Sequence, residues 1–487
     1  IQGGTSIPCF DNKAHGTEDL ETAFANSCNS AFSTIGTQLN RSAFKNLCST
    51  LMFNSNLPIG IEYNSSSFTL DDSSGISEAQ ETAIGQGKTM MTPIHNLMIT
   101  AAIANDGVMM TPYLVDHVQT ADKIIVEQPT PTALATVATA EEKKAPLKYV
   151  DALDFRMINK GFDDTETPYT RLPKYLQDSV RADLWNRQQC SSGLGIRFST
   201  NSTRVGVRYT LLWDTHMFHM ADTGLKGTDL YILTDDGRWE YVNTNRPIAN
   251  DKKECEKVFV ENLDGKAHEF LIYLPLYDGV TKMDIAVDSL AKIEKPKVDS
   301  PRKSKKIVMY GTSILQGGCS TRTGMVATNM IQRDLNCEVV NLGFSGEGKM
   351  DQCIARAMAR IKDADVYVLD PVPNCTEMMC DTLTYDFVKT LRELRPNVPI
   401  VMVEGPMYTY AKYDSFFKSY LPKKNAAYRK NYEKLVADGY KNIYYVTSEG
   451  LTGDDNEGTV DGIHFTDIGF RRYADKLIPV LKPLLEK

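Results

Sequence analysis

The chain contains a serine, an aspartate and a histidine that could together form a nucleophilic catalytic triad, Ser313, Asp461 and His464. Ser313 lies in the turn Gly311-Thr312-Ser313-Ile314 after the apolar run Ile307-Val308-Met309-Tyr310, whereas Asp461 and His464 lie close together. A serine hydroxyl is a poor nucleophile unless a histidine takes its proton and an acid fixes the tautomer of that histidine. Because only two residues separate Asp461 from His464, one turn can bring the carboxylate to one ring nitrogen and leave the other facing Ser313. The pattern predicts a serine hydrolase.

Two further polar clusters lie between the serine and the histidine, each at the end of a predicted strand. Asn341-Leu342-Gly343-Phe344-Ser345-Gly346 follows Glu338-Val339-Val340, and Pro373-Asn374-Cys375 follows another apolar run. In this order the four blocks resemble those of the SGNH (GDSL-like) hydrolase family. The resemblance implies that Ser313 is the nucleophile, His464 the general base and Asp461 its orienting acid. It also implies that the Gly346 backbone N–H and the Asn374 side-chain amide form the oxyanion hole.

One block departs from the family pattern. The third block of the family is often Gly-x-Asn-Asp, whereas this chain has Val372-Pro373-Asn374-Cys375. The amide donor is retained and its neighbours differ, so the direction of the Asn374 amide is not given by the motif. The other serine-hydrolase signature, Gly-x-Ser-x-Gly, does not fit, because Leu315 takes the place of its second glycine.

A β-rich region precedes these blocks. Apolar residues alternate with polar ones around residues 194–198, 205–209 and 270–274, and Asn-Ser and Asp-Gly turns separate the runs. This period of two predicts an antiparallel β-sandwich. Gly227-Thr228-Asp229-Leu230-Tyr231 resembles the Gly-x-Asp-Leu-Tyr element of the jelly-roll-like β-domain that precedes the catalytic domain in one SGNH subgroup. The resemblance covers residues from about 148 to the C-terminus.

The first part of the chain resembles a different family. Parts of a penicillin-binding protein transpeptidase domain are resembled by Gly16–Leu20, Ala25–Phe32, Ala83–Gly87, Thr92-Pro93 and Ala101–Gly107. In this resemblance Ser27-Cys28-Asn29 would be the Ser-x-Asn motif. No Ser-x-x-Lys precedes it and no Lys-Thr-Gly follows, since Lys88-Thr89-Met90 is only an echo of the latter. Without the Ser-x-x-Lys serine there is no acylation site. Residues 1–125 are therefore expected to be an incomplete α+β transpeptidase segment without transpeptidase chemistry of its own.

From residue 306 onward, predicted strands alternate with predicted helices, which is typical of an α/β fold. The expected strands are 307–310, 338–342, 366–369, 400–403 and 443–446, and the expected helices are 325–335, 350–361, 381–394, 424–437 and 466–485. Right-handed crossovers then give a flavodoxin-like, five-stranded parallel sheet. The loops after its first three strands bring Ser313, Gly346 and Asn374 to one edge of that sheet, and His464 arrives just before the final helix.

Length and composition agree with several domains. A chain of 487 residues exceeds what a single core organises. We expect the transpeptidase-like segment at 1–125, a linker at 126–147, the β-sandwich at 148–297 and the hydrolase domain at 306–487. The lysine- and proline-rich stretch 292–306 is a second seam, and its basic run 302–306 is expected to be a solvated linker. At a net charge of −8, nucleic-acid binding is not expected, and no apolar stretch is long enough for a membrane span.

The ten cysteines show no C-x-x-C spacing, which argues against a zinc ribbon or a thioredoxin-like motif. Most are expected to be buried, and Cys375 and Cys380 are the first pair to inspect for a disulfide. His216 and His219 have a spacing that would suit metal binding on a helix, but no third and fourth ligand lie near them in the sequence. No metal and no cofactor are therefore expected.

Two classes of function remain. The first is an esterase that removes short acyl groups, acetyl above all, from a polysaccharide or oligosaccharide through an acyl-enzyme at Ser313. The second is a glycan or cell-wall binding protein with an inactive α/β domain, and a transpeptidase remnant is a third idea. Arg322 could offer a forked donor to a sugar or carboxylate, or form a salt bridge that fixes its loop. Trp213 and Tyr231 could be sugar platforms or core residues. Both resemblances imply a location outside the cytoplasm.

Overall fold

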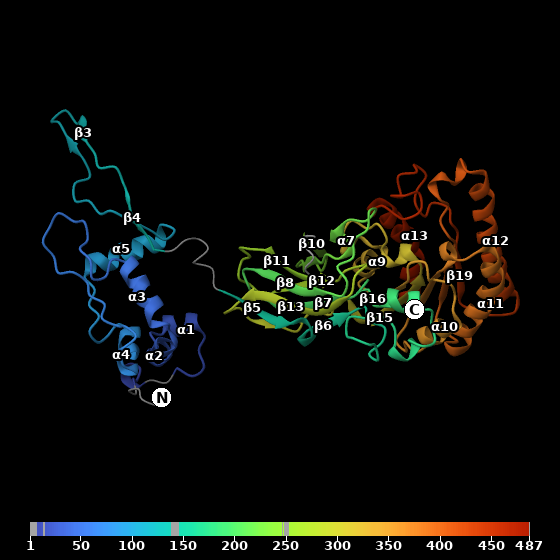
Figure 1. The fold of residues 1–487 in the computed structure, drawn as a ribbon, viewed down its shortest axis with the longest axis horizontal. Helices are drawn as coiled ribbons and strands as arrows, with labels where there is room; N and C mark the ends of the chain where they lie inside the picture. The colour runs from blue at the N-terminus through green and yellow to red at the C-terminus, as the bar shows by residue number, and fades with distance from the viewer. Residues whose placement is uncertain (1–6, 13–14, 138–145, 246, 248–252, 487) are drawn as a thin grey trace. The chain divides into compact units, whose positions relative to one another are not determined.

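The chain forms two compact units, residues 1–145 and 146–487. The structure is a computed structural model, and it describes residues 7–12, 15–137, 146–245, 247 and 253–486 (Figure 1).

The first unit is mainly helical. Its longer helices are α1 (Leu20–Ala25), α2 (Asn29–Gln38), α3 (Arg41–Thr50), α4 (Ile76–Ala83) and α5 (Pro93–Ala104). Asp19, Asn40 and Thr92 cap α1, α3 and α5 by accepting backbone N–H groups of the first turn, which satisfies donors that a helix leaves unpaired. Two short antiparallel pairs complete the unit, β1 (Val108–Met110) with β4 (Ala133–Thr136) and β2 (Val118–Gln119) with β3 (Ile125–Glu127).

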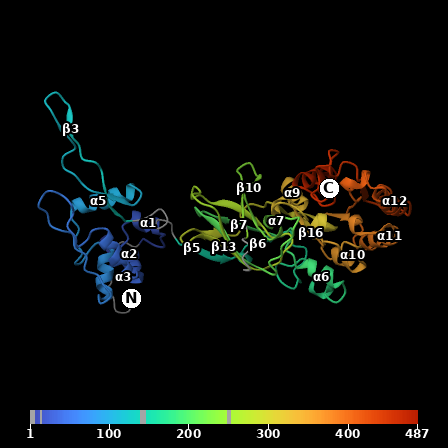
Figure 2. The same cartoon turned by 45° about the horizontal axis from the view of Figure 1, so that its top comes forward.

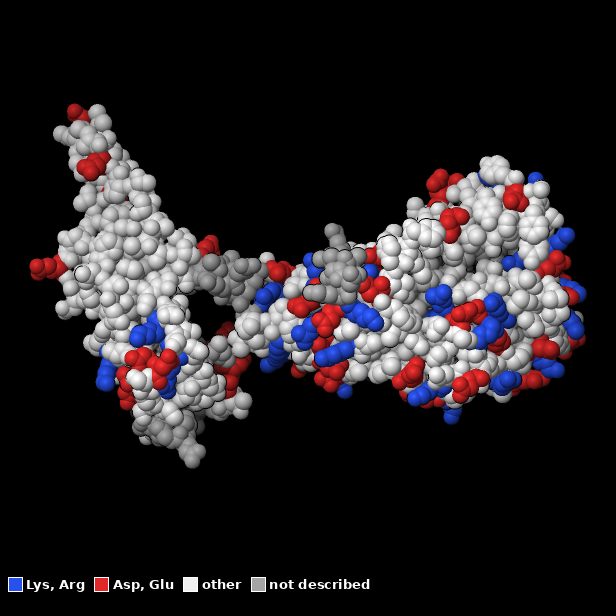
Figure 3. Space-filling view, viewed as in Figure 1, with Lys and Arg blue, Asp and Glu red and all other residues white. Residues whose placement is uncertain are grey.

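Many large apolar side chains of this unit are exposed. Phe24 is 77% exposed, Leu97 64% and Ile103 68%. In Figure 3 the surface of this unit is largely uncharged on the face shown. A complete domain covers most such side chains, so this exposure agrees with a segment that has only part of a domain core.

The stretch expected to be a linker, 126–147, is structured in part. Strand β4 lies inside it and pairs with β1, because Leu134 and Ala135 pack on the small core formed by Met98, Ala102 and Met109. The boundary between the two units falls at residues 145 and 146, within the expected stretch. Residues 138–145 of that stretch lie outside the described residues.

The second unit begins with two antiparallel sheets packed face to face. One sheet has the order β10-β9-β12-β7-β14, with β6 also paired to β7, and the other has the order β11-β8-β13-β5. The strands are β5 (Leu147–Asp151), β6 (Arg156–Ile158), β7 (Gly195–Thr200), β8 (Val205–Leu211), β9 (Asp229–Leu233), β10 (Trp239–Thr244), β11 (Glu254–Val260), β12 (His268–Tyr273), β13 (Val280–Asp288) and β14 (Ile293–Glu294). The alternate apolar residues Ile196, Phe198, Val205, Val207, Phe270 and Ile272 fill the core between the sheets. The predicted β-sandwich is confirmed.

A five-stranded parallel sheet follows, with the order β16-β15-β17-β18-β19. Its strands are β15 (Arg302–Gly311), β16 (Cys337–Gly343), β17 (Val366–Asp370), β18 (Ile400–Val403) and β19 (Ile443–Val446). Numbered along the chain, this is the flavodoxin-like order 2-1-3-4-5. The predicted α/β fold is therefore confirmed. The order reverses between β15 and its two neighbours, and ligand sites of such folds lie at that switch point, beyond the carboxyl ends of the strands.

Helices cover both faces of this sheet. The helices are α9 (Ala327–Leu335), α10 (Gln352–Ala359), α11 (Glu377–Leu394), α12 (Ser415–Ala437) and α13 (Asp467–Leu485). Ile307 and Met309 of β15 pack in the core with α9 and α13, whereas Val308 and Tyr310 pack in the core with α10, α11 and α12 (Figures 1 and 2). The second half of β15 is thus buried on both faces, which explains the continuous apolar run Ile307–Tyr310.

Two helices begin earlier than predicted. Helix α11 begins at Glu377, since Thr376 caps it by accepting the N–H of Met379 at 3.1 Å. Helix α12 begins at Ser415, where Asp414 accepts the N–H of Phe417 at 3.1 Å, and it continues through Pro422. Because proline usually ends a helical pattern, the predicted helix 424–437 begins after Pro422.

The basic run 302–306 is not a solvated linker, and that expectation is wrong. It is the first half of β15, and Lys306 pairs with Asp363 and Glu338. Segments before and after it form one compact unit, in which Arg156 bonds to Glu338 at 2.7 Å. Over residues 146–487, positive and negative side chains alternate on the face shown in Figure 3. Among the described residues, no helix combines the length and apolar character that a bilayer span requires.

Candidate active site

Ser313, His464 and Asp461 form a continuous chain of hydrogen bonds. The Oγ atom of Ser313 lies 2.9 Å from Nε2 of His464. On the other side of the ring, Nδ1 of His464 lies 2.7 Å from Oδ2 of Asp461. Ser313 is 7% exposed, and the histidine and aspartate side chains are 23% and 33% exposed. This geometry lets His464 accept the serine proton while Asp461 holds the ring in the required tautomer.

The turn after β15 positions Ser313. Thr312 precedes the single-turn helix α8 (Ser313–Gln316), and Gly317 ends it with a φ of 108°, a conformation that favours glycine. Gly318 lies directly against the site, because a Cβ atom there would come within 3.2 Å of the His464 ring. The glycines after Ser313 therefore allow the loop to pass close to the histidine.

The turn from Asp461 to His464 is built around the aspartate. Its Oδ1 atom accepts the backbone N–H groups of Ile463 at 3.0 Å and His464 at 2.8 Å. Burial alone would raise the pKa of Asp461, but these bonds and the His464 side chain lower the pKa of the carboxyl below its usual value. The carboxylate therefore stays ionised and oriented toward the imidazole.

Gly346 and Asn374 lie in the loops after β16 and β17, at the same edge of the sheet as Ser313. Gly346 has a φ of 75°, and a Cβ atom there would meet nothing within 4 Å, so its backbone borders open space. Asn374 is the last residue of the 3-10 turn Val372–Asn374. Its Oδ1 atom accepts the N–H of Gly348 at 3.2 Å. With the oxygen held in this way, the Nδ2 group is the end of the amide that can donate to a ligand.

Replacing Asn374 by alanine is expected to lower kcat by roughly 100- to 1,000-fold, about 3 to 4 kcal/mol, because the donor acts on charge that develops only in the transition state. Asn374→Asp should show the same loss, since it keeps the acceptor for Gly348 and removes the donor. The measurement is steady-state hydrolysis of p-nitrophenyl acetate. Asn397→Ala is the matched control, since Asn397 is exposed just before β18, at the opposite edge of the sheet. A rise in KM at unchanged kcat would instead make Asn374 a substrate-positioning residue.

Three buried residues that the sequence did not single out support the site. The Tyr277 hydroxyl donates to the backbone carbonyl of Ser313 at 3.1 Å. Gln316 accepts the N–H of Ser345 at 2.9 Å and thereby joins the serine turn to the Gly346 turn. Arg171 donates to the carbonyls of Asn341 and Gly343 at 3.1 and 2.8 Å, and burial lowers its pKa to about 10. All three act through tertiary contacts, so no local motif marks them.

Arg322 forms the salt bridge that the sequence left as one of two alternatives. Its Nη1 atom lies 2.7 Å from Asp229 and 2.7 Å from the Tyr231 hydroxyl, and its guanidinium lies over the ring of Tyr241 at 3.8 Å. These partners belong to β9 and β10, so the Gly-x-Asp-Leu-Tyr element anchors the loop after Ser313. Tyr231 is only 3% exposed and belongs to the core. The contacts of Arg322 match the salt-bridge alternative, in which the arginine fixes its loop.

The two histidines at 216 and 219 do not converge. His216 pairs with Asp222 at 3.1 Å and its side chain is 73% exposed, whereas the ring of His219 lies 5.8 Å from the ring of His464 between centroids.

The disulfide considered between Cys375 and Cys380 is not formed, since all ten cysteines are free. Both thiols are buried.

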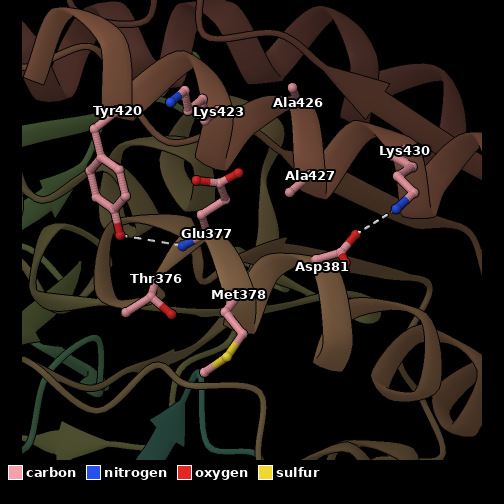
Figure 4. A pocket seen from close by; sticks show the side chains of 9 residues that line it. All are labelled: Thr376, Glu377, Met378, Asp381, Tyr420, Lys423, Ala426, Ala427 and Lys430. Atoms are coloured by element: carbon pink, nitrogen blue, oxygen red, sulfur yellow. Dashed lines mark hydrogen bonds and ion pairs between the residues drawn. The ribbon is translucent and has the colours of Figure 1, made fainter.

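A hollow on this unit lies between α11 and α12. It has a volume of about 860 Å³, and Thr376, Glu377, Asp381, Tyr420 and Lys430 are among its lining residues. Figure 4 shows that Lys430 and Asp381 face each other across it, and they form an ion pair at 2.8 Å. Ser313 does not line this hollow, so the volume carries no information on the acyl group.

Comparison with known proteins agrees with the fold. Residues 304–482 match the GDSL-like Lipase/Acylhydrolase family, and residues 147–293 match the family described as N-terminus of Esterase_SGNH_hydro-type. Residues 1–172 match the penicillin binding protein transpeptidase domain, which reaches beyond the expected 1–125. The chain belongs to the GDSL-like lipase/acylhydrolase family, and both predicted resemblances are confirmed.

The individual relatives support this assignment. A protein described as a GDSL-like lipase from Bacteroides ovatus is 32% identical with a TM-score of 0.66, over 70% of this chain and 98% of that one. The salicylyl-acyltransferase SsfX3 of a tetracycline biosynthetic pathway, 16% identical with a TM-score of 0.53 over 70% and 96%, shares the fold. Peptidoglycan D,D-transpeptidase PbpA of Mycolicibacterium smegmatis is 30% identical over 119 residues, which are 24% of this chain and 23% of PbpA. The chain thus spans less than a quarter of the length of the curated relatives it matches.

Proposed function

We propose that residues 146–487 form a serine esterase that removes short acyl groups, acetyl above all, from carbohydrate. The observation that carries the proposal is the hydrogen-bonded chain from Ser313 through His464 to Asp461. A non-catalytic binding protein would have no need to keep this arrangement intact. No transpeptidase activity is proposed, because no Ser-x-x-Lys precedes Ser27-Cys28-Asn29 and no Lys-Thr-Gly follows it in this sequence.

The reaction follows from the positions of these groups. His464 takes the proton of Ser313 as its Oγ atom forms a bond to the ester carbonyl carbon. The carbonyl oxygen becomes an oxyanion, which the Gly346 N–H and the Asn374 amide stabilise. His464 then returns the proton to the leaving alcohol as the ester C–O bond breaks and the acyl-enzyme forms. Water, deprotonated by His464, attacks the acyl-enzyme and releases the carboxylic acid and free Ser313.

The surroundings of the serine support a small acyl group. The loop after Ser313 is polar and glycine-rich, Gly317-Gly318-Cys319-Ser320-Thr321, and it passes against the His464 ring. Gly318 also lies next to the buried hydroxyl of Tyr277. A long acyl chain would need an apolar channel, and these residues do not provide one.

Exposed aromatic rings beside the site support a carbohydrate. Phe218 is 97% exposed, and its ring contacts His219 at 4.6 Å between centroids, which in turn lies against His464. Trp213, in the same loop between β8 and α7 (Asp222–Leu225), is 40% exposed. Exposed rings on one loop can pack against the apolar faces of sugar rings. An esterase that acts on a glycan would work outside the cytoplasm.

Activity toward p-nitrophenyl esters is expected to fall steeply from acetyl to octanoyl, and acetate should be released from acetylated polysaccharide or oligosaccharide. The measurement is an acyl-chain-length series run beside a panel of acetylated glycans, with kcat/KM for the esters and acetate release for the glycans. Ser313→Ala, assayed in parallel, separates enzymatic from spontaneous hydrolysis. Preference for octanoyl or longer chains, with no acetate from any glycan, would reject the carbohydrate assignment.

A further inference from the structure

Four side chains that can bind a metal ion meet at the histidine of the site. His219, Cys319, Asp461 and His464 each offer one ligand atom, and these atoms all lie within 4.8 Å of one another. In tetrahedral zinc sites with bonds of ~2.0 to 2.3 Å, neighbouring ligand atoms are ~3.5 Å apart. Small side-chain rotations would therefore bring the group to coordination distance.

One of these side chains has a ring nitrogen without a hydrogen-bond partner, and another carries a free thiol. The Nδ1 atom of His219 is buried and has no hydrogen-bond partner, although buried polar atoms normally have one. Cys319 is only 4% exposed, and its thiol is free. His219 reaches the site from the loop between β8 and α7, and Cys319 reaches it from the loop after Ser313. Imidazole and thiolate together are ligands that Zn²⁺ prefers.

The aspartate and the second histidine are arranged as they are in many zinc sites. Asp461 holds Nδ1 of His464 at 2.7 Å, which directs the lone pair of Nε2 away from the aspartate. A carboxylate behind a coordinating histidine fixes its tautomer and raises its basicity. The pair that presents Nε2 to Ser313 can therefore present the same atom to a metal ion.

We propose that His219, Cys319 and His464 form a site for Zn²⁺, with Asp461 orienting His464, and that bound Zn²⁺ reversibly inhibits the esterase. Binding replaces the thiol proton of Cys319, which passes to solvent, by a sulfur–zinc bond. The lone pair of His464 Nε2 is then bonded to zinc and can no longer accept the proton of Ser313. The metal site stands on geometry alone, whereas the inhibition rests on the proposed function.

Metal binding is tested without any substrate. Co²⁺ added to the full-length protein should produce the thiolate-to-cobalt charge-transfer absorption in the near ultraviolet, and Zn²⁺ should displace it. Cys319→Ser should abolish the band, and His219→Gln should weaken Co²⁺ binding at least tenfold. His216→Gln is the matched control, because His216 lies in the same loop and outside the cluster, and it should bind like the parent.

Inhibition is tested on p-nitrophenyl acetate. Zn²⁺ should lower turnover, EDTA should restore it, and the half-inhibitory Zn²⁺ concentration should rise at least tenfold in Cys319→Ser and in His219→Gln, with turnover without metal retained. The partly exposed His219 provides a second variant if Cys319→Ser does not fold. A charge-transfer band that persists in Cys319→Ser, or no band in the parent at millimolar Co²⁺, would overturn the metal site. If the protein hydrolyses no ester, the proposed function fails and the cobalt titration still decides the metal site.

Discussion

Replacing Ser313 by alanine is expected to abolish ester hydrolysis, with a loss in kcat of roughly 10⁴-fold or more. The Oγ atom is the one that His464 can deprotonate, at 2.9 Å from Nε2, and no acyl-enzyme can form without it. The same substitution should prevent labelling by a fluorophosphonate probe, because only an activated hydroxyl attacks such reagents.

Two measurements check this result, the hydrolysis rate of p-nitrophenyl acetate and the mass of the labelled peptide, which should contain Ser313. Ser304→Ala is a suitable control, because Ser304 is exposed at the beginning of β15, the strand that leads to Ser313. It should keep the parent activity. Undiminished turnover in Ser313→Ala would rule out the proposed mechanism.

Loss of His464 should reduce the rate more than loss of Asp461. Without the imidazole no group can accept the serine proton, so His464→Ala should lower kcat by roughly 10⁵-fold. Without the carboxylate the imidazole is present but poorly held, so Asp461→Ala should cost roughly 10³- to 10⁴-fold. The measurement is single-turnover acylation by p-nitrophenyl acetate.

The chain offers a matched control for this comparison. His268 and Asp264 form another histidine–aspartate pair at 2.7 Å, in the sandwich and partly exposed. His268→Ala and Asp264→Ala should leave the rate unchanged, which would show that losing such a pair elsewhere has no effect on turnover. A larger loss at Asp461 than at His464 would mean that the roles of base and orienting acid are wrongly assigned.

The parts of the fold that repeat a local pattern could be predicted from the sequence. Each parallel strand contains an apolar run, and the runs of β15, β16 and β17 are followed by the polar loops that carry Ser313, Gly346 and Asn374. The start of α12 was missed, because Pro422 lies inside the helix. The basic run 302–306 was misinterpreted for a similar reason, since local composition does not show that Lys306 has acidic partners on other segments.

The residues that hold the candidate site in place could not be predicted from local sequence patterns. Arg171 is a single arginine in an irregular segment, and only the folded chain brings it under the carbonyls of β16. The sequence pairs His219 with the nearby His216 as a possible metal ligand, whereas the folded chain places His219 beside His464. Arg322 could be assigned to a salt bridge only once the position of Asp229 was known.

The hydrogen bonds of the site join parts of the chain that are far apart, and this affects when activity appears during folding. Ser313 and His464 are separated by 151 positions, and Arg171 and Gly343 by 172. Contacts of such high sequence separation close slowly, because the loop entropy must be overcome before they contribute. During synthesis, a nascent chain can form the sandwich and most of the parallel sheet while it is still catalytically silent. Esterase activity therefore reports the last stage of folding of this unit rather than the formation of its core.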